Sequence, residues 1–447
     1  MAKKKQIELT IEEKLQNALV SKEEQPYKIP NNWCWSYWKY CGKFIAGNGF
    51  KNIYQGFTQY DIPYYKVGSL KFCDEGNYLI DETNTINKEI RTKLKAVKIP
   101  VNSIIFAKIG EAIKLNRRCL NKIECCIDNN LMAFISEKYF YKYIFYWTKS
   151  LNFYELTNAT TVPALRKTDL ENIPIPLPPL NEQQRIVNII ESLFVKLDRA
   201  KELIENTLAQ FEQNKMAILH KAFTGELTAK WRKENNINEK NFFNKVKLKN
   251  VIKLISGRDV SVSLCNDKSI GIPYILGASN IKDNKFFIER WIENPVVVSE
   301  KNDILLSVKG TIGKLYLQKE EKINISRQIM ALRALNELNT HYLYYFLLRE
   351  CERLKFEGNG LIPGISRKDI LDLNILLPTL EEQQEIVNIL DNLLAKYNKI
   401  KNLEQQLEKI ELLKKAILAK VFRGELGTNN PDEESAENLL KEILAEK

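Results

Sequence analysis

Apolar residues recur at alternating spacings of four and three along residues 186–218. Eight of these ten positions are apolar: Ile186, Ile190, Leu193, Leu197, Ala200, Ile204, Thr207, Phe211, Asn214 and Ile218. This spacing keeps one stripe of a helix facing a partner helix, as in a coiled coil. The pattern predicts a long helix that begins near Leu180 and ends at Gly225, a residue suited to a left-handed helix end.

A second series of the same kind ends at Gly424 and comprises Ile386, Leu390, Leu393, Tyr397, Ile400, Leu403, Leu407, Ile410 and Ile417. The sequences around the two series also match. Residues 177–194 and 377–394 share 11 of 18 positions, and residues 215–227 and 414–426 share 9 of 13. Two copies at a spacing of about 200 residues indicate a tandem duplication of a domain plus a helix.

The stretches between the helices read as mixed α+β domains. Short β-type runs such as 102–110 alternate with turn residues, and a helical stretch covers 138–156. "IPYYKVGS" in the first stretch resembles "IPYILGAS" in the second, and "NSIIFAKIG" resembles "NDILLSVKG". Four prolines between residues 174 and 179 predict an extended segment before the first helix.

The two chain ends have patterns of their own. Thr10 and Glu13 form a capping box ahead of a helix over 11–20, and the acidic end of the chain carries a short helical pattern at 436–445. We therefore expect six segments. They are an N-terminal helical segment 1–25, a first domain 26–178, a first helix 179–226, a second domain 227–378, a second helix 379–426 and an acidic tail 427–447.

Composition narrows the possible functions. The net charge of +11 suits a polyanionic partner such as nucleic acid. No apolar run approaches the roughly 20 residues that span a bilayer, and no signal-peptide pattern follows the first lysines. The eight cysteines include no Cys-x-x-Cys pair, which argues against a disulfide framework or zinc site and fits the cytoplasm.

No catalytic motif stands out. The chain has only two histidines, so we expect no metal site and no histidine base. The glycines of Gly310–Lys314 are too close together for a phosphate loop. The usual adenine methyltransferase motif, Asn-Pro-Pro or Asp-Pro-Pro followed by an aromatic residue, is absent. These observations favour a basic, duplicated, non-catalytic binding protein.

The repeated helix starts "PLPPLNEQQRIV" and "LPTLEEQQEIV" resemble the specificity subunit of type I restriction-modification systems. The helix ends "FTGEL" and "FRGEL", the opening "QPYKIPNNWCW" and the approach "SRKDI" add to this resemblance, which covers roughly residues 10–426. One departure lies before the first helix, where Leu165-Arg-Lys-Thr replaces the Ile365-Ser-Arg-Lys of the second half.

The resemblance implies an α+β fold with two pseudo-twofold-related target recognition domains separated by two long antiparallel coiled-coil helices. It also implies a sequence-specific, non-catalytic subunit that reads a bipartite double-stranded DNA target. The implied partners are two methyltransferase subunits and restriction subunits. Adenine methylation and ATP-dependent cleavage, with S-adenosylmethionine, ATP and Mg, would belong to those partners. A spacer helix of about 40 residues, roughly 60 Å long, would act as a ruler between the half-sites.

Basic and amide residues in the domains are the DNA-binding candidates. They are Asn48, Lys108, Lys114, Arg117, Arg118, Asn129 and Asn130 in the first half, and Arg258, Lys309, Lys314, Arg327 and Gln328 in the second. Arg258 follows Gly257 as Asn48 follows Gly47. Asparagine can pair with adenine and arginine with guanine, whereas lysine mostly positions the phosphate backbone.

The helix starts have two readings. Glu182, Gln183 and Gln184, with Glu382, Gln383 and Gln384, either satisfy the free amides of the helix start or present a polar surface to the methyltransferase. Two other functions also remain open at this point. A coiled-coil scaffold would bind a partner without preference for a DNA sequence, and a diverged enzyme with an unrecognised carboxylate site would turn over substrate alone.

Overall fold

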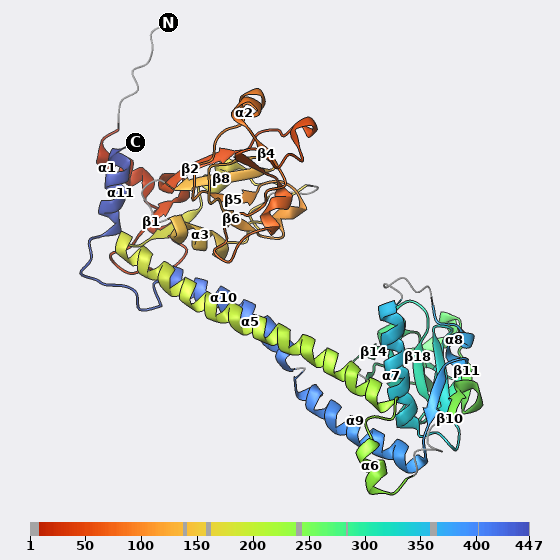
Figure 1. Ribbon diagram of the computed structural model, residues 1–447. Coiled ribbons are helices and arrows are strands. Elements are labelled where there is room, and N and C mark those ends of the chain that lie inside the picture. Colours follow the sequence, from red (N-terminus) through yellow and green to blue (C-terminus); the bar gives the residue numbers. More distant parts are fainter. Residues whose placement is uncertain are drawn as a thin grey trace. The chain divides into compact units, whose positions relative to one another are not determined.

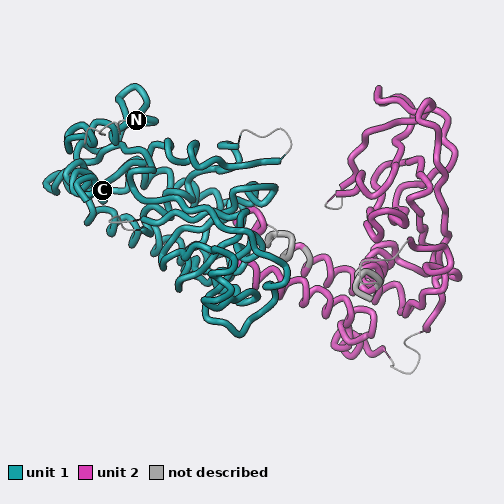
Figure 2. The backbone as a smooth tube through the Cα atoms, turned by 90° about the horizontal axis from the view of Figure 1, so that it is seen from above, with its two compact units in different colours: residues 1–202, 407–447 teal, residues 203–406 magenta. Residues whose placement is uncertain are grey.

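Each half of the chain folds around a four-stranded antiparallel sheet with a helix packed on it (Figure 1). The computed structural model describes residues 9–136, 141–157, 162–237, 244–282, 285–357, 364–400 and 402–446. The chain divides into two compact units (Figure 2): unit 1 combines residues 1–202 with 407–447, and unit 2 is residues 203–406. Each unit therefore contains one domain together with the start of one long helix and the end of the other.

The elements of unit 1 follow in chain order. They are α1 (Ile11–Ala18), β1 (Cys34–Tyr37), β2 (Gly42–Ala46), β3 (Ile62–Tyr65), β4 (Thr85–Ile86), α2 (Lys88–Leu94), β5 (Ile104–Ala107), β6 (Arg118–Leu120), β7 (Cys126–Ile127), β8 (Leu131–Ser136), α3 (Tyr141–Ser150), α4 (Lys167–Glu171), β9 (Pro174–Leu177), the first part of α5 (Leu180–Ala222), most of α10 (Asn402–Phe422) and α11 (Ala436–Ala445). The main sheet has the order β2-β8-β5-β6, with antiparallel neighbours throughout.

Unit 2 repeats this plan. Its elements are the end of α5, α6 (Ala229–Glu234), β10 (Asn244–Lys247), β11 (Ile252–Ser256), β12 (Cys265–Asn266), β13 (Ile272–Ile275), β14 (Ile281–Lys282), β15 (Lys285–Phe286), β16 (Trp291–Ile292), β17 (Val298–Glu300), β18 (Ile304–Ser307), β19 (Leu315–Leu317), β20 (Lys322–Ile325), β21 (Ile329–Ala334), α7 (Thr340–Glu357), α8 (Arg367–Leu371), β22 (Asn374–Leu377) and α9 (Leu380–Ile400). Its main sheet, β11-β21-β18-β19, matches that of unit 1 strand for strand.

The predicted α+β fold and the predicted duplication are both confirmed at the level of strand pairing. The prolines of β9 form an extended strand against β1, and β22 pairs with β10 in the same way. A smaller sheet beside the main one contains a parallel pair in each unit, β3 with β7 and β13 with β20. The departure before the first helix also has a local effect: Ser366 caps α8 through a capping box, whereas Arg166 gives α4 no side-chain cap.

The core of unit 1 is built around Trp38. Its ring centroid lies 4.7 Å from that of Phe44 and 5.0 Å from those of Phe134 and Trp147. This cluster joins β2, β8 and α3, so the aromatic helix predicted over 138–156 packs as core within its described part. Aromatic rings bury large apolar areas and favour edge-to-face contacts, so this cluster stabilises the packing of α3 on the main sheet.

The long helices run antiparallel within unit 1. Lys201 on α5 pairs with Glu411 on α10 at 3.1 Å, and Asp198 pairs with Lys414 further along α10. The predicted apolar seam is fully buried beside the domains, as at Ile186 and Ile190, but only half-buried at later positions such as Leu197. Val195, by contrast, is 67% exposed, so two helices alone leave apolar surface uncovered.

Both helix ends predicted from glycine are confirmed. Gly225 and Gly424 have φ values of 81° and 72°, the left-handed region that glycine adopts without strain. The second long helix is described as α9 and α10, on either side of residue 401, which lies outside the described residues.

The acidic end of the chain is part of unit 1. The predicted helix over 436–445 forms as α11, and its buried Leu440 and Leu444 join the same apolar cluster as Leu15 of α1. The backbone amide of Ala436 donates to the carbonyl of Asn32 at 3.0 Å. Packing of this kind brings the first and last described segments of the chain together.

A buried carboxylate holds the start of each long helix. In unit 1 Glu182 has no exposed surface and accepts hydrogen bonds from Trp33 Nε1 at 2.8 Å, Thr428 Oγ1 at 3.0 Å and Asn429 Nδ2 at 3.0 Å. The residues that follow the end of α10 therefore bind the start of α5 through the Glu182 carboxylate. Burying a carboxylate without such partners would cost several kcal/mol.

The same arrangement recurs in unit 2 with different partners. Glu382, at the start of α9, is also fully buried and accepts from Thr228 and from Arg232 Nη1 at 2.7 Å. Thr228 directly follows the first "GEL", Thr428 follows the second after Gly427, and each donates to the carboxylate at the start of the other long helix. The repeated sequence thus encodes one tertiary contact, made once in each unit.

Replacing Glu382 with alanine is expected to lower the stability of unit 2 by about 3 kcal/mol or more, because the buried Arg232 guanidinium loses its carboxylate. Hydrogen exchange across residues 225–235 and 380–390 would measure this loss. Glu205→Ala, at an exposed position on α5 in the same unit, is the matched control and should change exchange little. Equal protection in both variants would contradict a stabilising role for the buried carboxylate.

Candidate nucleic-acid interface

Three loops of unit 1 meet at one edge of the main sheet because of strand register. Ala46 at the end of β2 pairs with Met132 near the start of β8, and Ala107 at the end of β5 pairs with Leu131. The loop after β2, the loop after β5 and the loop before β8 therefore leave the sheet at the same edge. All seven DNA-binding candidates of the first half lie on or next to these three loops.

Unit 2 builds the same edge. Ser256 at the end of β11 pairs with Met330, and Ser307 at the end of β18 pairs with Ile329. The loops after β11 and β18 and the loop before β21 carry the candidates of the second half, Arg258, Lys309, Lys314, Arg327 and Gln328. Strand register thus brings the candidate positions of each unit to one edge of its main sheet, and their role in DNA binding stays a prediction.

Backbone hydrogen bonds connect these loops in the same way in both units. Asn48 N donates to Ile127 O at 3.0 Å, and Arg258 N donates to Ile325 O at 3.0 Å. In unit 1 the amide of Lys108 donates to Asn130 O at 2.9 Å, and in unit 2 the amide of Val308 donates to Gln328 O at 2.8 Å. The loop backbones are thus equivalent while their side chains differ.

A glycine lies at the tightest point of each loop cluster. A Cβ atom on Gly47 would lie 1.9 Å from the carbonyl oxygen of Asp128, and one on Gly257 would lie 2.1 Å from that of Ser326. Neither distance is physically possible for a side chain. The glycine before Asn48 and Arg258 is therefore required by close approach of two backbones.

The candidates of unit 1 differ in exposure. Lys114, Arg117 and Asn129 are exposed, with Lys114 paired to Glu111 at 2.7 Å, whereas Asn48, Lys108 and Asn130 are half-buried. The Oδ1 atom of Asn48 accepts from Val97 N at 2.9 Å. This bond uses one of the two acceptor sites of Oδ1, so the Asn48 amide keeps one acceptor site and its nitrogen donors for a ligand.

Asp128 fixes the loop before β8. Its buried carboxylate accepts from the amide of Asn130 at 3.0 Å, and burial raises the pKa of this carboxyl above its ordinary value. Ser326 Oγ accepts from the amide of Gln328 at 3.1 Å in the same place of unit 2. Asn130 and Gln328, both amide side chains, therefore occupy equivalent positions on equally constrained turns.

Arg118 is a correction to the sequence prediction, because its side chain faces the core. It is 2% exposed, its guanidinium donates to Leu151 O at 2.8 Å, and it stacks on Phe153 at 3.8 Å. Burial lowers its pKa from the ordinary arginine value. Arg117 and Arg118 are adjacent where β6 begins, so their side chains point to opposite faces, and only Arg117 is exposed.

The candidates of unit 2 are all exposed. Arg327 is oriented by Asp259, whose Oδ2 atom lies 2.7 Å from Arg327 Nε. The turn before Lys314 is held by Ser307, whose hydroxyl accepts from Lys314 N at 2.8 Å and donates to Thr311 O at 2.8 Å. The glycine-rich Gly310–Lys314 segment is thus a tight turn between β18 and β19 that leaves Lys314 exposed.

The residues predicted to form a partner surface divide into two groups. Glu182, Gln183, Glu382 and Gln383 are fully buried. Their side chains satisfy groups inside each unit, as when Gln183 Nε2 donates to Pro178 O at 3.0 Å, so the surface prediction is wrong for these four. Gln184 and Gln384 are exposed, and a partner role for them stays a prediction.

Sequence reasoning missed the residues that bind the buried carboxylates. Trp33, Thr228, Arg232 and Thr428 lie far from Glu182 and Glu382 in the sequence. A threonine one or two residues after each repeated "GEL" was an available signal. It lay outside the helical patterns on which the prediction rested.

No group of three or more potential metal-ligating side chains occurs among the described residues. Over the same residues, no helix combines the length and hydropathy that a membrane crossing requires. The eight cysteines are all free thiols.

Comparison with protein families identifies the kind of domain that carries these loop clusters. The model of the type I restriction modification DNA specificity domain matches the chain twice, at residues 51–212 and 241–412, which together exceed half its length. The chain belongs to the type I restriction-modification DNA specificity family. Each unit contains most of one specificity domain, so the two loop clusters belong to two copies of that domain.

Similar proteins span most of this chain. The putative type I restriction enzyme MjaX specificity subunit of Methanocaldococcus jannaschii is 27% identical over 339 residues, covering 72% of each chain. The type I restriction enzyme EcoBI specificity subunit of Escherichia coli is 27% identical over 331 residues, covering 65% of this chain and 68% of that one.

Solved structures share the fold of this specificity-family chain. A chain from a study of complex assembly and conformational transition in a type I R-M system has a TM-score of 0.72 at 22% identity, covering 90% of this chain and all of that one. The HsdS subunit of Thermoanaerobacter tengcongensis has a TM-score of 0.55 at 22% identity with the same coverage. The predicted fold class is confirmed by these matches together with the two specificity domains.

Gly47→Ala is expected to push the loop of Asn48 away from Asp128, because the new methyl group would overlap a carbonyl oxygen. Such overpacking costs roughly 1–3 kcal/mol. Thermal unfolding of unit 1, followed by tryptophan fluorescence, would measure the loss. Gly49→Ala is the control, since a Cβ at that position meets nothing within 4 Å; an equal loss in both variants would refute the close-approach argument.

Proposed function

We propose that this chain is the DNA-reading subunit of a type I restriction-modification complex, with each loop cluster reading one half of a bipartite target. The observation that carries the proposal is the pair of equivalent loop frameworks with different side chains, which are half-buried in unit 1 and exposed in unit 2. Asn48 and Arg258 hold the same backbone position, as do Asn130 and Gln328. A shared framework with changed side chains is what two different half-sites require.

The side chains of these loops suit DNA chemistry. An asparagine or glutamine amide can bind adenine through two hydrogen bonds, and an arginine can bind guanine in the same way. Lys108, Lys309 and Lys314 border these amides and would neutralise neighbouring phosphates. The net charge of +11 is consistent with such contacts.

We assign catalysis to partner subunits. The 447-residue sequence lacks the usual adenine methyltransferase motif, and its two histidines lie on helices outside the loop clusters. Two methyltransferase subunits and the restriction subunits would supply the chemistry in the cytoplasm, together with S-adenosylmethionine, ATP and Mg. Val195, Leu412 and Leu413, between 50% and 67% exposed on the long helices of unit 1, offer apolar surface for such docking.

The direct test is selection from a random double-stranded DNA library by this chain assembled with its methyltransferase subunit. A two-part motif with a fixed gap is the expected result. Binding of the methyltransferase with no enriched sequence would support a coiled-coil scaffold instead. Turnover of DNA by the isolated chain would support the alternative of a diverged enzyme.

Gln328→Ala and Lys309→Ala should affect DNA binding in different ways. Loss of the Gln328 amide should cost about 1–3 kcal/mol at one base pair and relax preference there, because a base contact is removed. Loss of the Lys309 charge should weaken binding to all sequences alike and reduce the salt slope by about 1. Affinities for single-base variants of the target at several salt concentrations would separate the two effects.

Lys319→Ala is the control for both variants. Lys319 is exposed, but it follows β19 at the opposite edge of the sheet, since the end of β19 pairs with the start of β18. It should leave affinity and salt slope nearly unchanged. A specificity change from Lys319→Ala, with none from Gln328→Ala, would show that DNA contacts the edge of Lys319. That result would contradict the proposal.

Lengthening both long helices by seven residues should widen the gap between half-sites. Seven residues preserve the four–three spacing and add about 10 Å, which equals roughly three base pairs. Repeating the library selection with the lengthened chain would measure the new gap. An unchanged gap in a folded, binding variant would show that the helices do not set the spacing.

A further inference from the structure

Two cysteines from separate segments of unit 1 are in direct contact. Cys73 follows a short helical turn over Val67–Lys71, and Cys119 lies in the middle of β6. Their Sγ atoms share a hydrogen bond at 2.6 Å, although 46 positions separate the two residues in the sequence. A disulfide bond joins two sulfur atoms at about 2.0 Å, so a small further approach would bring these thiols to bonding distance.

Backbone hydrogen bonds hold the two segments side by side. Cys73 belongs to a loop over residues 72–80, which we call the 72–80 loop. In this loop the amide of Leu79 donates to Leu120 O at 2.8 Å, and Asn77 O accepts from the amide of Leu120 at 2.9 Å. Because β6 is the last strand of the main sheet, the loop extends that edge of the sheet. The contact between the thiols is therefore fixed by the fold.

The two thiols differ in exposure and in acidity. Cys73 is half-buried, whereas Cys119 is 2% exposed. The hydrogen bond with Cys119 lowers the pKa of the Cys73 thiol, although burial acts in the opposite direction. The charges of Lys149 and Arg117 lower this pKa further. The same hydrogen bond, together with burial, raises the pKa of Cys119. Cys73 is therefore the sulfur that carries the thiolate and meets solvent, as a reactive cysteine requires.

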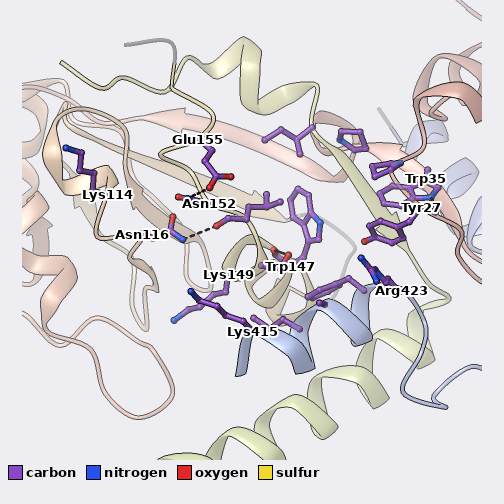
Figure 3. Close-up of a pocket in the computed structure, with 18 residues that line it drawn as sticks. Tyr27, Trp35, Lys114, Asn116, Trp147, Lys149, Asn152, Glu155, Lys415 and Arg423 are labelled. Atoms are coloured by element: carbon purple, nitrogen blue, oxygen red, sulfur yellow. Dashed lines mark hydrogen bonds between the residues drawn. The ribbon is translucent and has the colours of Figure 1, made fainter. Parts of the chain in front are cut away.

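Lys149 is a cation held close to this pair. Its Nζ atom donates to Asn77 Oδ1, within the 72–80 loop, at 2.7 Å. Lys149 comes from α3 and lines two cavities of unit 1, one of about 710 Å³ (Figure 3) and one of about 560 Å³ that residues 75–77 also line. Glu75 and Gly76 are exposed, so water and small solutes reach the turn that follows Cys73.

Unit 2 does not repeat this pair. The register of β18 with β19, compared with that of β5 with β6, places Tyr316 where unit 1 has Cys119. Tyr316 is buried against Phe286, with ring centroids 5.8 Å apart. The half-buried cysteine of unit 2, Cys265, donates to the carbonyl oxygen of Ser261 at 3.7 Å. Oxidation of the thiol pair would therefore act on unit 1 alone, and Cys265 provides an internal comparison.

We propose that Cys73 and Cys119 form a reversible disulfide when hydrogen peroxide oxidises the chain, and that this bond fixes the 72–80 loop to β6. The inference goes beyond the proposed function and does not depend on it. Disulfides that form in a reducing compartment are usually transient and respond to oxidants. Arg117, a DNA-binding candidate, lies two residues before Cys119, so the bond would form beside the candidate interface of one domain only.

The oxidation takes place in two balanced steps. The Cys73 thiolate attacks one oxygen of hydrogen peroxide, so a sulfur–oxygen bond forms, the oxygen–oxygen bond breaks and hydroxide leaves. Cys73 is then a sulfenic acid, oxidised by two electrons. Cys119 next attacks the Cys73 sulfur, so the disulfide forms and the sulfur–oxygen bond breaks. The hydroxyl group leaves as water with the proton of the Cys119 thiol, and an added dithiol reverses the oxidation.

Peptide mass spectrometry of the full chain tests the pair directly. The chain is treated with hydrogen peroxide, its remaining thiols are alkylated, and it is digested with trypsin without reduction. Cleavage after Lys71 and Arg118 places the two cysteines on different peptides, 72–88 and 119–122. These two peptides should appear joined, with two hydrogens fewer than their sum, and dithiothreitol should separate them. Cys73 should be oxidised about tenfold faster than Cys265 or more.

Three serine variants assign the roles of the two sulfurs. In Cys119→Ser the Cys73 sulfenic acid should persist and be trapped by dimedone, because its resolving thiol is absent. In Cys73→Ser, Cys119 should stay reduced. Cys265→Ser is the matched control and should form the joined peptides at the unaltered rate. Circular dichroism would confirm that each variant is folded, and the test on the unaltered chain needs no variant.

Hydrogen exchange measures whether the bond fixes the loop. Oxidation should slow amide exchange across residues 72–80 and 118–120 about tenfold or more, because the disulfide limits opening of the loop. Exchange across β19, the matching strand of unit 2, should not change. The inference would be overturned if both cysteines were still alkylated after peroxide treatment, if Cys73 and Cys265 were oxidised at equal rates, or if Cys73 joined a second copy of the chain. Joined peptides without slower exchange would overturn the effect on the loop.

Discussion

A buried carboxylate at the start of each long helix is the interaction on which the rest of the structure depends. Glu182 and Glu382 are fully buried, and both accept hydrogen bonds from residues that follow the end of the other long helix. The contact fastens the start of one helix to the end of the other inside a single unit. It explains why the sequence repeats both the Glu-Gln-Gln start and the "GEL" end.

This fastening also determines how a recognition domain is carried. In each unit the strand before the helix start, β9 or β22, pairs with the first strand of the domain. The domain is therefore attached to its helix pair on both sides, by strand pairing and by the buried carboxylate. The loop-bearing edge of the main sheet and the ends of the long helices then belong to one compact unit.

Much of this could be predicted from the sequence because the duplication supplies an internal comparison. Residues shared by the two halves mark framework, such as Gly47 and Gly257, and residues that differ mark surface, such as Asn48 and Arg258. Short sequence motifs predicted the structure correctly where a single segment determines it. The capping box at Thr10 and the helix over 436–445 both form as expected.

The remaining features depend on contacts that a linear pattern does not contain. Arg118 reads as a basic surface residue until β6 places it against Phe153 in the core. Glu182 reads as an exposed helix-start residue until Trp33, 149 positions earlier, and Thr428, 246 positions later, surround it. In both cases tertiary burial overrides the usual preference of a charged side chain for solvent.

The most direct measurement of the central claim is site-specific photo-cross-linking to the selected DNA target. A photoreactive residue at position 130 in unit 1, or at position 328 in unit 2, lies on the proposed base-reading edge. Position 122 in unit 1 and position 319 in unit 2 lie at the opposite edge of the corresponding main sheet. The account predicts cross-links from position 130 to one half-site, from position 328 to the other, and none from the opposite edge. Cross-links from positions 122 and 319 instead, or from 130 and 328 to the same half-site, would contradict it.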